Sequence, residues 1–341
     1  MFVPHIYSVE SVTPGHPDKV CDQISDAILD ACLRQDPLSR VAIESFGAHG
    51  HLVLGGEVTT HALVAYEEIA RQVYRDIGYT DTLEITTHIV QQSPEIAQGV
   101  DTGGAGDQGV MYGYACDETP ELLPKGVVLA HQLARGLDAL RRDVPIGPDG
   151  KTQVTMDGLR VTDIVVSTQH QPRLVLEQLR RAVLTRLIHP ILGDLDGVRV
   201  QINPAGAWHI GGFAADTGLT GRKLMVDTYG GCIPHGGGAF SGKDATKVDR
   251  SAAYFCRYVA RTLVAEGRAK QCLVSVAYAI GQAEPVMVSA VDEMGRDRSS
   301  ELRQRFDFRP HAMIEQLGLR RPIFRMTATF GHFGRPELPW Q

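Results

Sequence analysis

The sequence lacks the features that would place it in a membrane, in the secreted class or among nucleic-acid-binding proteins. No apolar run of about 18 residues occurs, and the first ten residues show no basic region followed by an apolar core. The formal net charge is -6, and only 22% of the residues are charged, so no overall positive field favours nucleic acid or an anionic membrane. We therefore expect a cytoplasmic protein that holds any anionic ligand by local positive charge.

The cysteines also lack the spacing of a zinc site or a redox motif. The chain has six of them and no C-x-x-C pair. Without a secretion signal, we expect buried free thiols rather than disulfides. The six are Cys21, Cys32, Cys116, Cys232, Cys256 and Cys272.

With 341 residues, of which 43% are apolar, the chain exceeds one ordinary core and is expected to form several domains. Apolar spacing predicts four amphipathic helices, at 17–31, 63–77, 176–187 (before Pro190) and 253–263. Asp22, Asp26 and Asp30 of the first lie off its apolar face. Strand-like runs occur at 40–45, 51–58, 161–168, 198–202, 272–280 and 285–291. Because strands and helices do not alternate strictly, we expect an α+β fold, with helices covering sheets and candidate boundaries at 99–109 and 203–212.

Two glycine patterns resemble well-known nucleotide motifs but lack the required context. Residues 104–109 match G-x-G-x-x-G, yet a loop precedes them and a strand-like run follows, whereas a dinucleotide fold needs a strand before and a helix after. Residues 237–243 resemble a P-loop, but Asp244 stands where a magnesium-binding Ser or Thr is required. Neither match predicts its usual fold.

The segment 235–250 can still bind phosphate. Six glycines between Gly230 and Gly242 allow backbone amides to approach an anion closely. Lys243 and Lys247 are four residues apart, the spacing that places two side chains on one helix face, and Asp244 and Asp249 could bind Mg²⁺. The alternative, which these residues alone leave open, is a surface turn with two solvated lysines.

A second candidate phosphate site lies in residues 10–19. His16 and Asp18 flank Pro17 where the first helix is expected to begin, and the unpaired N–H groups of a helix start favour anions. His16 could donate to a phosphate oxygen, and Asp18 could hold a metal ion. The alternative is a plain helix cap.

These segments together resemble the S-adenosylmethionine synthetases, also called methionine adenosyltransferases, over nearly the whole chain. The matching blocks are 10–19, 21–26, 55–60, 92–94, 98–101, 104–109, 218–223, 227–231, 235–250, 278–281 and 331–335. The resemblance implies three similar α+β domains in a pseudo-threefold arrangement, with segments partly interleaved in space. We place them at 1–98, 103–208 and 209–341. It also implies a dimer or tetramer with active sites at the subunit interface.

The reaction implied by the resemblance joins ATP and L-methionine. The methionine sulfur displaces triphosphate from C5' of ATP, and the triphosphate is then cleaved to pyrophosphate and phosphate. The residues agree with this chemistry, because a thioether carries no proton and needs no general base. The leaving group, with roughly four negative charges, instead requires preorganised cations.

Residue-by-residue likeness assigns the following roles. The catalytic residues are His16, Lys151, Arg222 and Lys243, and the ATP-binding set adds Asp107, Asp149, Trp208, Asp216, Lys223 and Ala239. Glu57, Gln92, Asp216 and Lys247 match methionine-binding positions. Asp18 and Asp249 match the ligands of two Mg²⁺ ions per site, and Glu44 matches the ligand of an activating K⁺. Without the family, Glu44 and Glu57 would pass as charged strand ends, and Lys151 as part of a solvated turn.

The chain departs from the family pattern at two places. Ala207-Trp208 stands where the family often has Arg-Phe, which keeps an aromatic platform for adenine but loses a cation. The stretch 101–104 and the region before Gln92 are shorter than expected, which abbreviates a loop that gates the site in the family. Two rival functions follow: a weakened relative that only binds nucleotide or S-adenosylmethionine, and an enzyme that only hydrolyses triphosphate.

Overall fold

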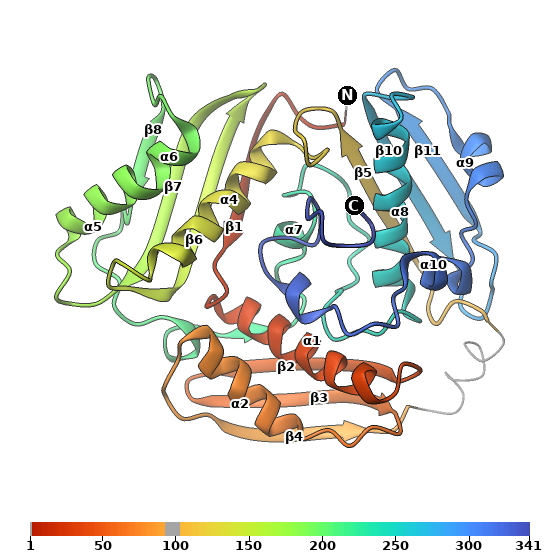
Figure 1. The fold of residues 1–341 in the computed structure, drawn as a ribbon, viewed down its shortest axis with the longest axis horizontal. Helices are drawn as coiled ribbons and strands as arrows, with labels where there is room; N and C mark the ends of the chain where they lie inside the picture. The colour runs from red at the N-terminus through yellow and green to blue at the C-terminus, as the bar shows by residue number, and fades with distance from the viewer. Residues whose placement is uncertain (1, 93–102) are drawn as a thin grey trace.

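The computed structural model describes residues 2–92 and 103–341. Three β-sheets surround a central region that contains a short helix and the C-terminal end of the chain, and helices lie against each sheet (Figure 1). The predicted α+β fold is confirmed. No helix among the described residues has the length and apolar character to cross a membrane.

The first sheet has the strand order β1-β6-β7-β8. Its strands are β1 (Ile6–Val12), β6 (Ile146–Asp157), β7 (Arg160–His170) and β8 (Arg199–Ile202), and α4 (Lys125–Leu140) packs on β1 and β6. The β1–β6 and β6–β7 pairs are antiparallel, whereas β7 and β8 are parallel. The pairing of β1 with β6 brings the segment before the first helix beside Asp149 and Lys151.

The second sheet has the order β4-β3-β2-β9. Its strands are β2 (Arg40–Ala48), β3 (His51–Thr59), β4 (Glu84–Val90) and β9 (Gly218–Leu219), covered by α1 (Pro17–Gln35) and α2 (Tyr66–Ile77). The third sheet, β11-β10-β5, contains β5 (Gly109–Cys116), β10 (Gln271–Tyr278) and β11 (Met287–Asp292). It packs against α8 (Val248–Ala265) and α9 (Ser299–Arg305), and α10 (Pro310–Leu317) lies against α8.

Each sheet takes strands from two distant parts of the chain. β9 joins a sheet otherwise built from residues 40–90, and β5 joins one built mainly from 271–292. The division into 1–98, 103–208 and 209–341 stays a prediction.

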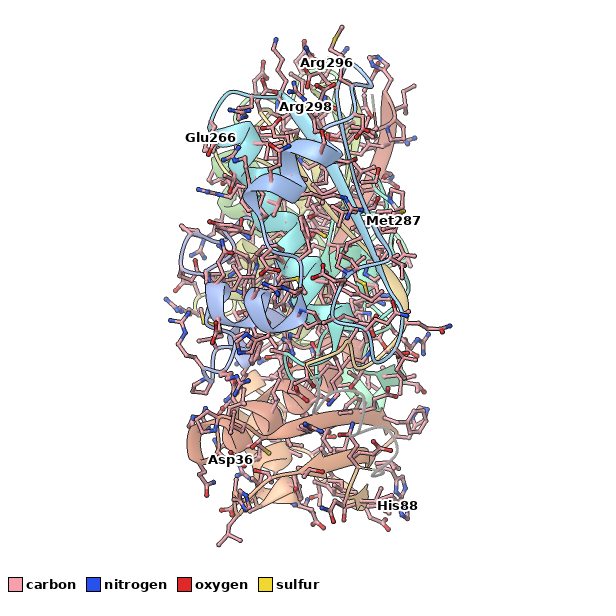
Figure 2. All side chains as sticks on the ribbon, turned by 90° about the vertical axis from the view of Figure 1, so that its right-hand side faces the viewer. Asp36, His88, Glu266, Met287, Arg296 and Arg298 are labelled. Carbon is pink, nitrogen blue, oxygen red and sulfur yellow. The ribbon has the colours of Figure 1, made fainter. Side chains whose placement is uncertain are left out.

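In the part of the chain that the structure describes, the second and third sheets each have one face without helices, and apolar side chains are exposed there. Phe46 on β2 pairs with Val53 on β3, and both are exposed. In the third sheet Val110 and Met287 flank the same residue of β10, and both are exposed. Figure 2 shows Met287 on the side of β11 turned away from the helices.

Several helix predictions need correction. The helix expected at 63–77 begins only at Tyr66, and the one expected to end before Pro190 continues past it. α5 (Leu176–Val183) runs through a π-helical turn into α6 (His189–Leu192). Pro190 is tolerated because it stands in the first turn of α6, where its missing N–H is not needed.

The prediction that α1 is apolar on one side only is the clearest error of the sequence analysis. Every residue from Pro17 to Asp30 is buried, including Asp22 and Asp26, which were expected on a polar face. The helix lies between the second sheet and segments from the C-terminal third of the chain, so it has no solvent side over this length. The cysteine prediction, in contrast, is confirmed, since all six thiols are free and buried.

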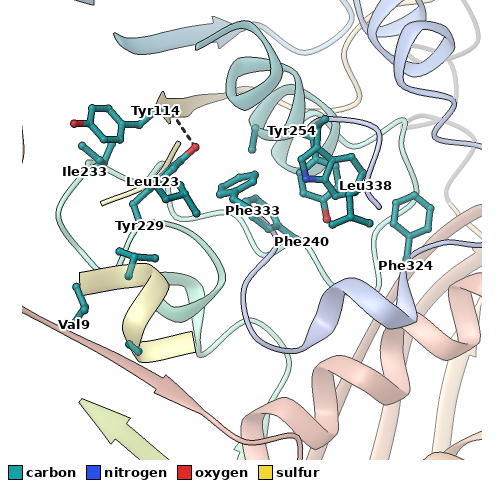
Figure 3. Packing of buried hydrophobic residues seen from close by; sticks show 14 of the residues in the cluster. Val9, Tyr114, Leu123, Tyr229, Ile233, Phe240, Tyr254, Phe324, Phe333 and Leu338 are labelled. Atoms are coloured by element: carbon teal, nitrogen blue, oxygen red, sulfur yellow. Dashed lines mark hydrogen bonds between the residues drawn. The ribbon is translucent and has the colours of Figure 1, made fainter. Parts of the chain in front are cut away.

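A buried aromatic cluster anchors the glycine-rich segment. Phe240 lies edge-on to Tyr254 and Phe333, and Phe333 stacks on Tyr229 with 4.9 Å between ring centroids (Figure 3). The Tyr229 hydroxyl accepts a hydrogen bond of 2.8 Å from the backbone N–H of Tyr114. Phe240 therefore fixes the loop that precedes Lys243.

Candidate active site

The loop before α1 is tied to β6 through backbone hydrogen bonds. The Thr13 N–H donates to Gly150 O at 3.0 Å, and the Thr13 hydroxyl donates to Pro148 O at 2.6 Å. Gly15 packs so closely on Pro148 that an added Cβ would lie 2.4 Å from its carbonyl. These contacts hold His16 beside the polar residues of β6.

His16 caps α1. Its Nδ1 accepts a 3.2 Å hydrogen bond from the Asp18 N–H, so the predicted cap is present, while the phosphate-binding role of His16 stays a prediction. Burial lowers the pKa of His16 to about 3, and the positive charges of Lys223 and Lys151 add to this effect. The imidazole is therefore neutral at physiological pH, and because Nδ1 accepts, the proton resides on Nε2.

Asp149 lies next to Lys151, one of these two lysines. One carboxylate oxygen accepts from the Gly212 N–H at 2.9 Å, and the other is buried without a partner among the described residues. Burial raises the pKa of Asp149 to about 6, opposed by the Gly212 hydrogen bond and Lys151, while Asp216 raises it further. An orphaned buried carboxylate oxygen indicates a place where a ligand donor can bind.

Asp18 is contacted by β9 and by two positively charged side chains from the segment that follows it. The Lys223 ammonium lies 2.7 Å from its carboxylate, and the Leu219 N–H donates to it at 3.0 Å. The Arg222 guanidinium approaches within 3.9 Å and is more than half exposed. The structure thus forms a first cluster, which consists of His16, Asp18, Asp149, Lys151, Asp216, Arg222 and Lys223.

A second cluster forms where residues 242–244 run along the edge of β2. The Ile43 N–H donates to Gly242 O, and Ala42 forms an isolated bridge with Lys243. The Lys243 ammonium lies 2.6 Å from Asp249 in the first turn of α8. Because Ala42 also pairs with Glu57 on β3, Glu57 and Lys243 flank the same residue of β2.

Glycines are required where the loop crosses Asp249. A Cβ on Gly238 would lie 2.0 Å from the Asp249 carboxylate. Gly221 has φ +80°, and a Cβ there would lie 2.4 Å from the Cβ of Ala239. The loops that carry the two clusters therefore touch at Gly221 and Ala239, and the second cluster comprises Ala239, Lys243 and Asp249.

The sequence was wrong about Lys243 and Lys247. Helix α8 begins only at Val248, so the two lysines do not share a helix face. Lys247 instead lies 2.5 Å from Asp244, which also accepts from the backbone N–H groups of Val41 and Thr246. Asp244 is buried and fully engaged by these contacts, so it stabilises the bend before α8 and offers no vacant oxygen to Mg²⁺.

The remaining predicted residues lie outside the two clusters. Glu44 is exposed on β2, and Asp107 is exposed just before β5, where its side chain accepts from the Gln108 N–H. Trp208 folds back on its own chain through an indole hydrogen bond to Ile210 O at 2.6 Å. The side-chain oxygen of Gln92 is buried without a partner among the described residues. Residues 101 and 102 of the predicted short gate lie outside the described residues.

The carboxylates predicted to bind metal suit Mg²⁺ that is held jointly with substrate phosphates. They do not suit a metal ion that is held by protein ligands alone. Among the described residues no group of three or more His, Cys, Asp or Glu side chains could hold a metal ion. Asp18 and Asp249 instead stand singly, each against a lysine ammonium. Mg²⁺ in phosphoryl-transfer sites is commonly bound through one or two carboxylates together with substrate phosphates, which is what these residues can offer.

Three buried aspartates of α1, Asp22, Asp26 and Asp30, have structural roles that the sequence analysis missed, and Asp18, already predicted as a metal ligand, lies in line with them. At a spacing of four these aspartates form a row along the helix, and each accepts a backbone N–H from a distant part of the chain, Asp18 and Asp22 from the same segment. The pairs are Asp18 with Leu219, Asp22 with Gly221, Asp26 with Gly242, and Asp30 with Phe324. Asp22 and Asp26 hold the loops of the two clusters one helical turn apart, or about 6 Å along the axis. The regular spacing was visible in the sequence and is the signal that could have identified them.

Nearly the whole chain matches known proteins. Residues 4–97, 102–208 and 210–341 match the family models of the N-terminal, central and C-terminal domains of S-adenosylmethionine synthetase. The S-adenosylmethionine synthase of Desulforudis audaxviator is 48% identical over 378 aligned positions, covering 99% of this chain and 95% of the relative. That of Pseudothermotoga lettingae is 48% identical (98% of this chain and 96% of the relative), and that of Treponema denticola 46% (98% and 95%).

The first alignment also contains gaps in this chain. Its 378 positions exceed the 341 residues of the chain by 37, so at least 37 positions are gaps in this chain. From three matched domains and nearly complete coverage at almost half identity, we conclude that the chain belongs to the S-adenosylmethionine synthetase family of enzymes.

Proposed function

We propose that this protein synthesises S-adenosylmethionine from ATP and L-methionine by attack of the methionine sulfur on C5' of ATP, followed by hydrolysis of the triphosphate to pyrophosphate and phosphate. One observation carries the proposal. A neutral histidine at a helix start, His16, stands among Lys151, Lys223 and two carboxylates in a chain of this family. Such a cluster suits a polyanionic leaving group.

The transfer step needs charge stabilisation rather than proton removal. The attacking thioether has no proton, so the barrier depends on how well the departing triphosphate is held. The Nε2–H of His16 can donate to the oxygen that leaves C5', and Lys151, Lys223 and Arg222 supply positive charge around it. The low pKa of His16 suits this role, because a neutral imidazole donates without adding a charge that must be desolvated.

Mg²⁺ is the cofactor that these residues suit. Asp18 and Asp249 would each hold one ion, which supplies Lewis-acid stabilisation of the phosphate oxygens. In the ligand-free chain Lys223 forms an ion pair with Asp18, and Lys243 forms one with Asp249. Both ammonium groups would contact the phosphates instead once the carboxylates hold Mg²⁺. Each lysine thus neutralises its carboxylate until substrate arrives.

Substrate recognition divides between the clusters and the second sheet. Asp149, with its free buried oxygen, Asp216, Asp107, Trp208 and Ala239 are the proposed contacts of the adenosine. Glu57 and Gln92 lie near the same end of β3 and β4, and together with Lys247 and Asp216 they are proposed to bind methionine. The unpaired Gln92 oxygen is available to the methionine ammonium.

The proposed activating ion is K⁺ at Glu44. A monovalent ion needs several oxygen ligands, and Glu44 is a single exposed carboxylate, so further oxygens must come from outside the strand that carries it. The uncovered sheet face is a surface on which a second subunit could supply them.

A dimer or tetramer with active sites between subunits would cover these faces. Phe46, Val53, Val110 and Met287 expose apolar surface on the sides of the sheets that lack helices. Lys243 and Glu57 flank the same strand, β2, that carries Phe46, so the second cluster adjoins this surface. We propose a cytoplasmic oligomer without nucleic-acid or membrane partners.

Incubation of the protein with ATP, methionine, Mg²⁺ and K⁺, analysed by mass spectrometry, tests the proposed function. S-adenosylmethionine with phosphate and pyrophosphate is expected. Phosphate release without adenosyl transfer would instead establish a triphosphate hydrolase, and binding without turnover would establish a ligand-binding relative. Omission of K⁺ is expected to slow the reaction without abolishing it.

A further inference from the structure

We infer that Lys19, Asp22 and Asp227 form a buried clamp that positions Arg222 and Lys223 for the triphosphate without touching it. The inference rests on the proposed function, because it concerns how two of the proposed triphosphate ligands are held. It adds three positioning residues to a site in which they have no direct contact role.

The centre of the clamp is the Lys19 ammonium. It lies 2.9 Å from Asp22 and also contacts Asp227, which is 208 residues away in the sequence. The three side chains are at most 2% exposed. None of them can therefore reach a ligand bound at the surface of the cluster.

Asp22 holds the beginning of the segment that carries the two cations. Its second oxygen accepts a 2.9 Å hydrogen bond from the Gly221 N–H, immediately before Arg222. Gly221 has φ +80° and lies against Ala239, which leaves no room for a side chain at this turn. The carboxylate thus fixes a tight turn, which only glycine fits, at the point where the chain bends toward Arg222.

Asp227 holds the end of the same segment. It is the last residue of α7 (Leu224–Asp227), its N–H donates to Lys223 O at 2.8 Å, and its own carbonyl accepts from the His332 N–H at 2.9 Å. Arg222 and Lys223 therefore lie between two anchor points, and one ammonium group bridges both. Displacement of either anchor moves the two cations together.

The charges of the clamp favour a positioning role over simple stabilisation. Two carboxylates share one lysine in a dry interior, and burial raises the pKa of Asp227. Buried ion pairs gain little net stability over apolar side chains of the same size, because desolvation offsets their attraction. What such a group provides is one defined geometry, since each oxygen must meet its donor.

Asp30, the last aspartate of the row, provides a matched control. Asp30 is also buried on α1, but it accepts from the N–H groups of Phe324 and Arg325, outside the 218–227 segment. Asp22→Asn and Asp30→Asn each remove one buried carboxylate charge from the same helix. Only Asp22→Asn loosens the segment that carries Arg222 and Lys223.

The test compares wild type, Asp22→Asn and Asp30→Asn in the full chain, with Asp227→Asn as a second clamp variant in case Asp22→Asn does not fold. Inorganic tripolyphosphate with Mg²⁺ is the binding probe, measured by calorimetry, and hydrogen exchange is followed in residues 218–227. We expect clamp variants to bind tripolyphosphate about tenfold or more weakly, to raise the KM for ATP but not for methionine, and to exchange faster in 218–227 only. Asp30→Asn is expected to match wild type in affinity and in that segment.

The outcomes separate the clamp from the proposed function. If the clamp variants match Asp30→Asn in exchange and affinity, or if both KM values change equally, the clamp is overturned while the activity stands. If wild type makes no S-adenosylmethionine, the proposed function fails, and unchanged exchange in 218–227 would still refute the clamp.

Discussion

The ammonium of Lys223 lies 2.7 Å from the carboxylate of Asp18, directly beside the histidine that caps α1. The second cluster repeats this relationship with Lys243 and Asp249, 2.6 Å apart. Each carboxylate proposed to hold Mg²⁺ is thus already paired with a cation proposed to bind phosphate. Asp18 and Asp249 would exchange their lysine partners for Mg²⁺ when substrate binds, and Lys223 and Lys243 would then contact phosphate.

The first prediction follows from that exchange. Lys223→Met removes a phosphate cation and leaves Asp18 without its ammonium partner. We expect the KM for ATP to rise about tenfold or more, since a charge-assisted hydrogen bond to phosphate is lost, while half-saturation requires less Mg²⁺ because no ammonium competes for the carboxylate. Steady-state kinetics at varied Mg²⁺ measures both. Lys125→Met, at a half-buried lysine on α4 whose ammonium donates to Leu159 O, should change neither.

Lys151 offers a second test on a rigid strand. Lys151→Met is expected to cut adenosyl transfer at least about tenfold, or roughly 1.4 kcal/mol in transition-state free energy. Gln153→Ala alters another exposed residue of β6, two positions along, and should leave the rate unchanged. Equal rates for the two variants would remove Lys151 from the proposed site.

His16 allows its cap role and its donor role to be separated. Asn is a good helix N-cap, so His16→Asn preserves the hydrogen bond to the start of α1 but removes the Nε2–H. We expect kcat to fall about 100-fold or more, the size of losing one oxyanion donor, with little change in melting temperature. A variant that loses stability but keeps its rate would show that His16 is only a cap.

The lowered pKa of His131 leads to a prediction of how the free energy of unfolding depends on pH. Burial lowers its pKa to about 3 from an ordinary 6.5, with Arg135 adding to the effect, and its Nδ1 pairs with the Ser11 hydroxyl. The folded protein keeps this imidazole neutral, so its stabilising contribution is complete above pH 6.5. That contribution is lost as the pH falls toward 3, because the unfolded chain takes up a proton first.

Urea unfolding of His131→Gln at several pH values measures this contribution. Between pH 6.5 and 4, wild type should lose up to about 1.4 kcal/mol per pH unit relative to the variant. His5→Gln, at an exposed histidine, should run parallel to wild type over the same range. A His131→Gln curve that also stays parallel to wild type would contradict the prediction.

The sequence predicted local elements well and long-range neighbours poorly. The start of α1 at Pro17 and the strands near 40–45 and 51–58 follow from periodicity and helix signals, which are local. The pairing of β1 with β6 was missed, because it joins residues more than 130 positions apart. The residue pattern of one strand does not indicate which other strand it pairs with. Among the described residues, tertiary packing also overrode the polar pattern of α1, since distant N–H groups satisfy Asp22 and Asp26.

The candidate site shows the same division. The family resemblance named the residues of the first cluster, and the structure brings them close together, while their roles in binding and catalysis stay predictions. The helical spacing of Lys243 and Lys247 misled, because Asp244 holds the chain in a bend and delays the helix to Val248. Lys19 and Asp227 passed unnoticed, since a lysine reads as a surface residue until its buried partners are known.

Phosphorus NMR of a reaction with ATP, methionine, Mg²⁺ and K⁺, with S-adenosylmethionine measured in parallel, tests the central claim most directly. We predict one phosphate and one pyrophosphate for each S-adenosylmethionine throughout the time course, no ADP, and loss of all three products in His16→Asn. Phosphate and pyrophosphate formed without S-adenosylmethionine, or ADP as the product, would contradict the account.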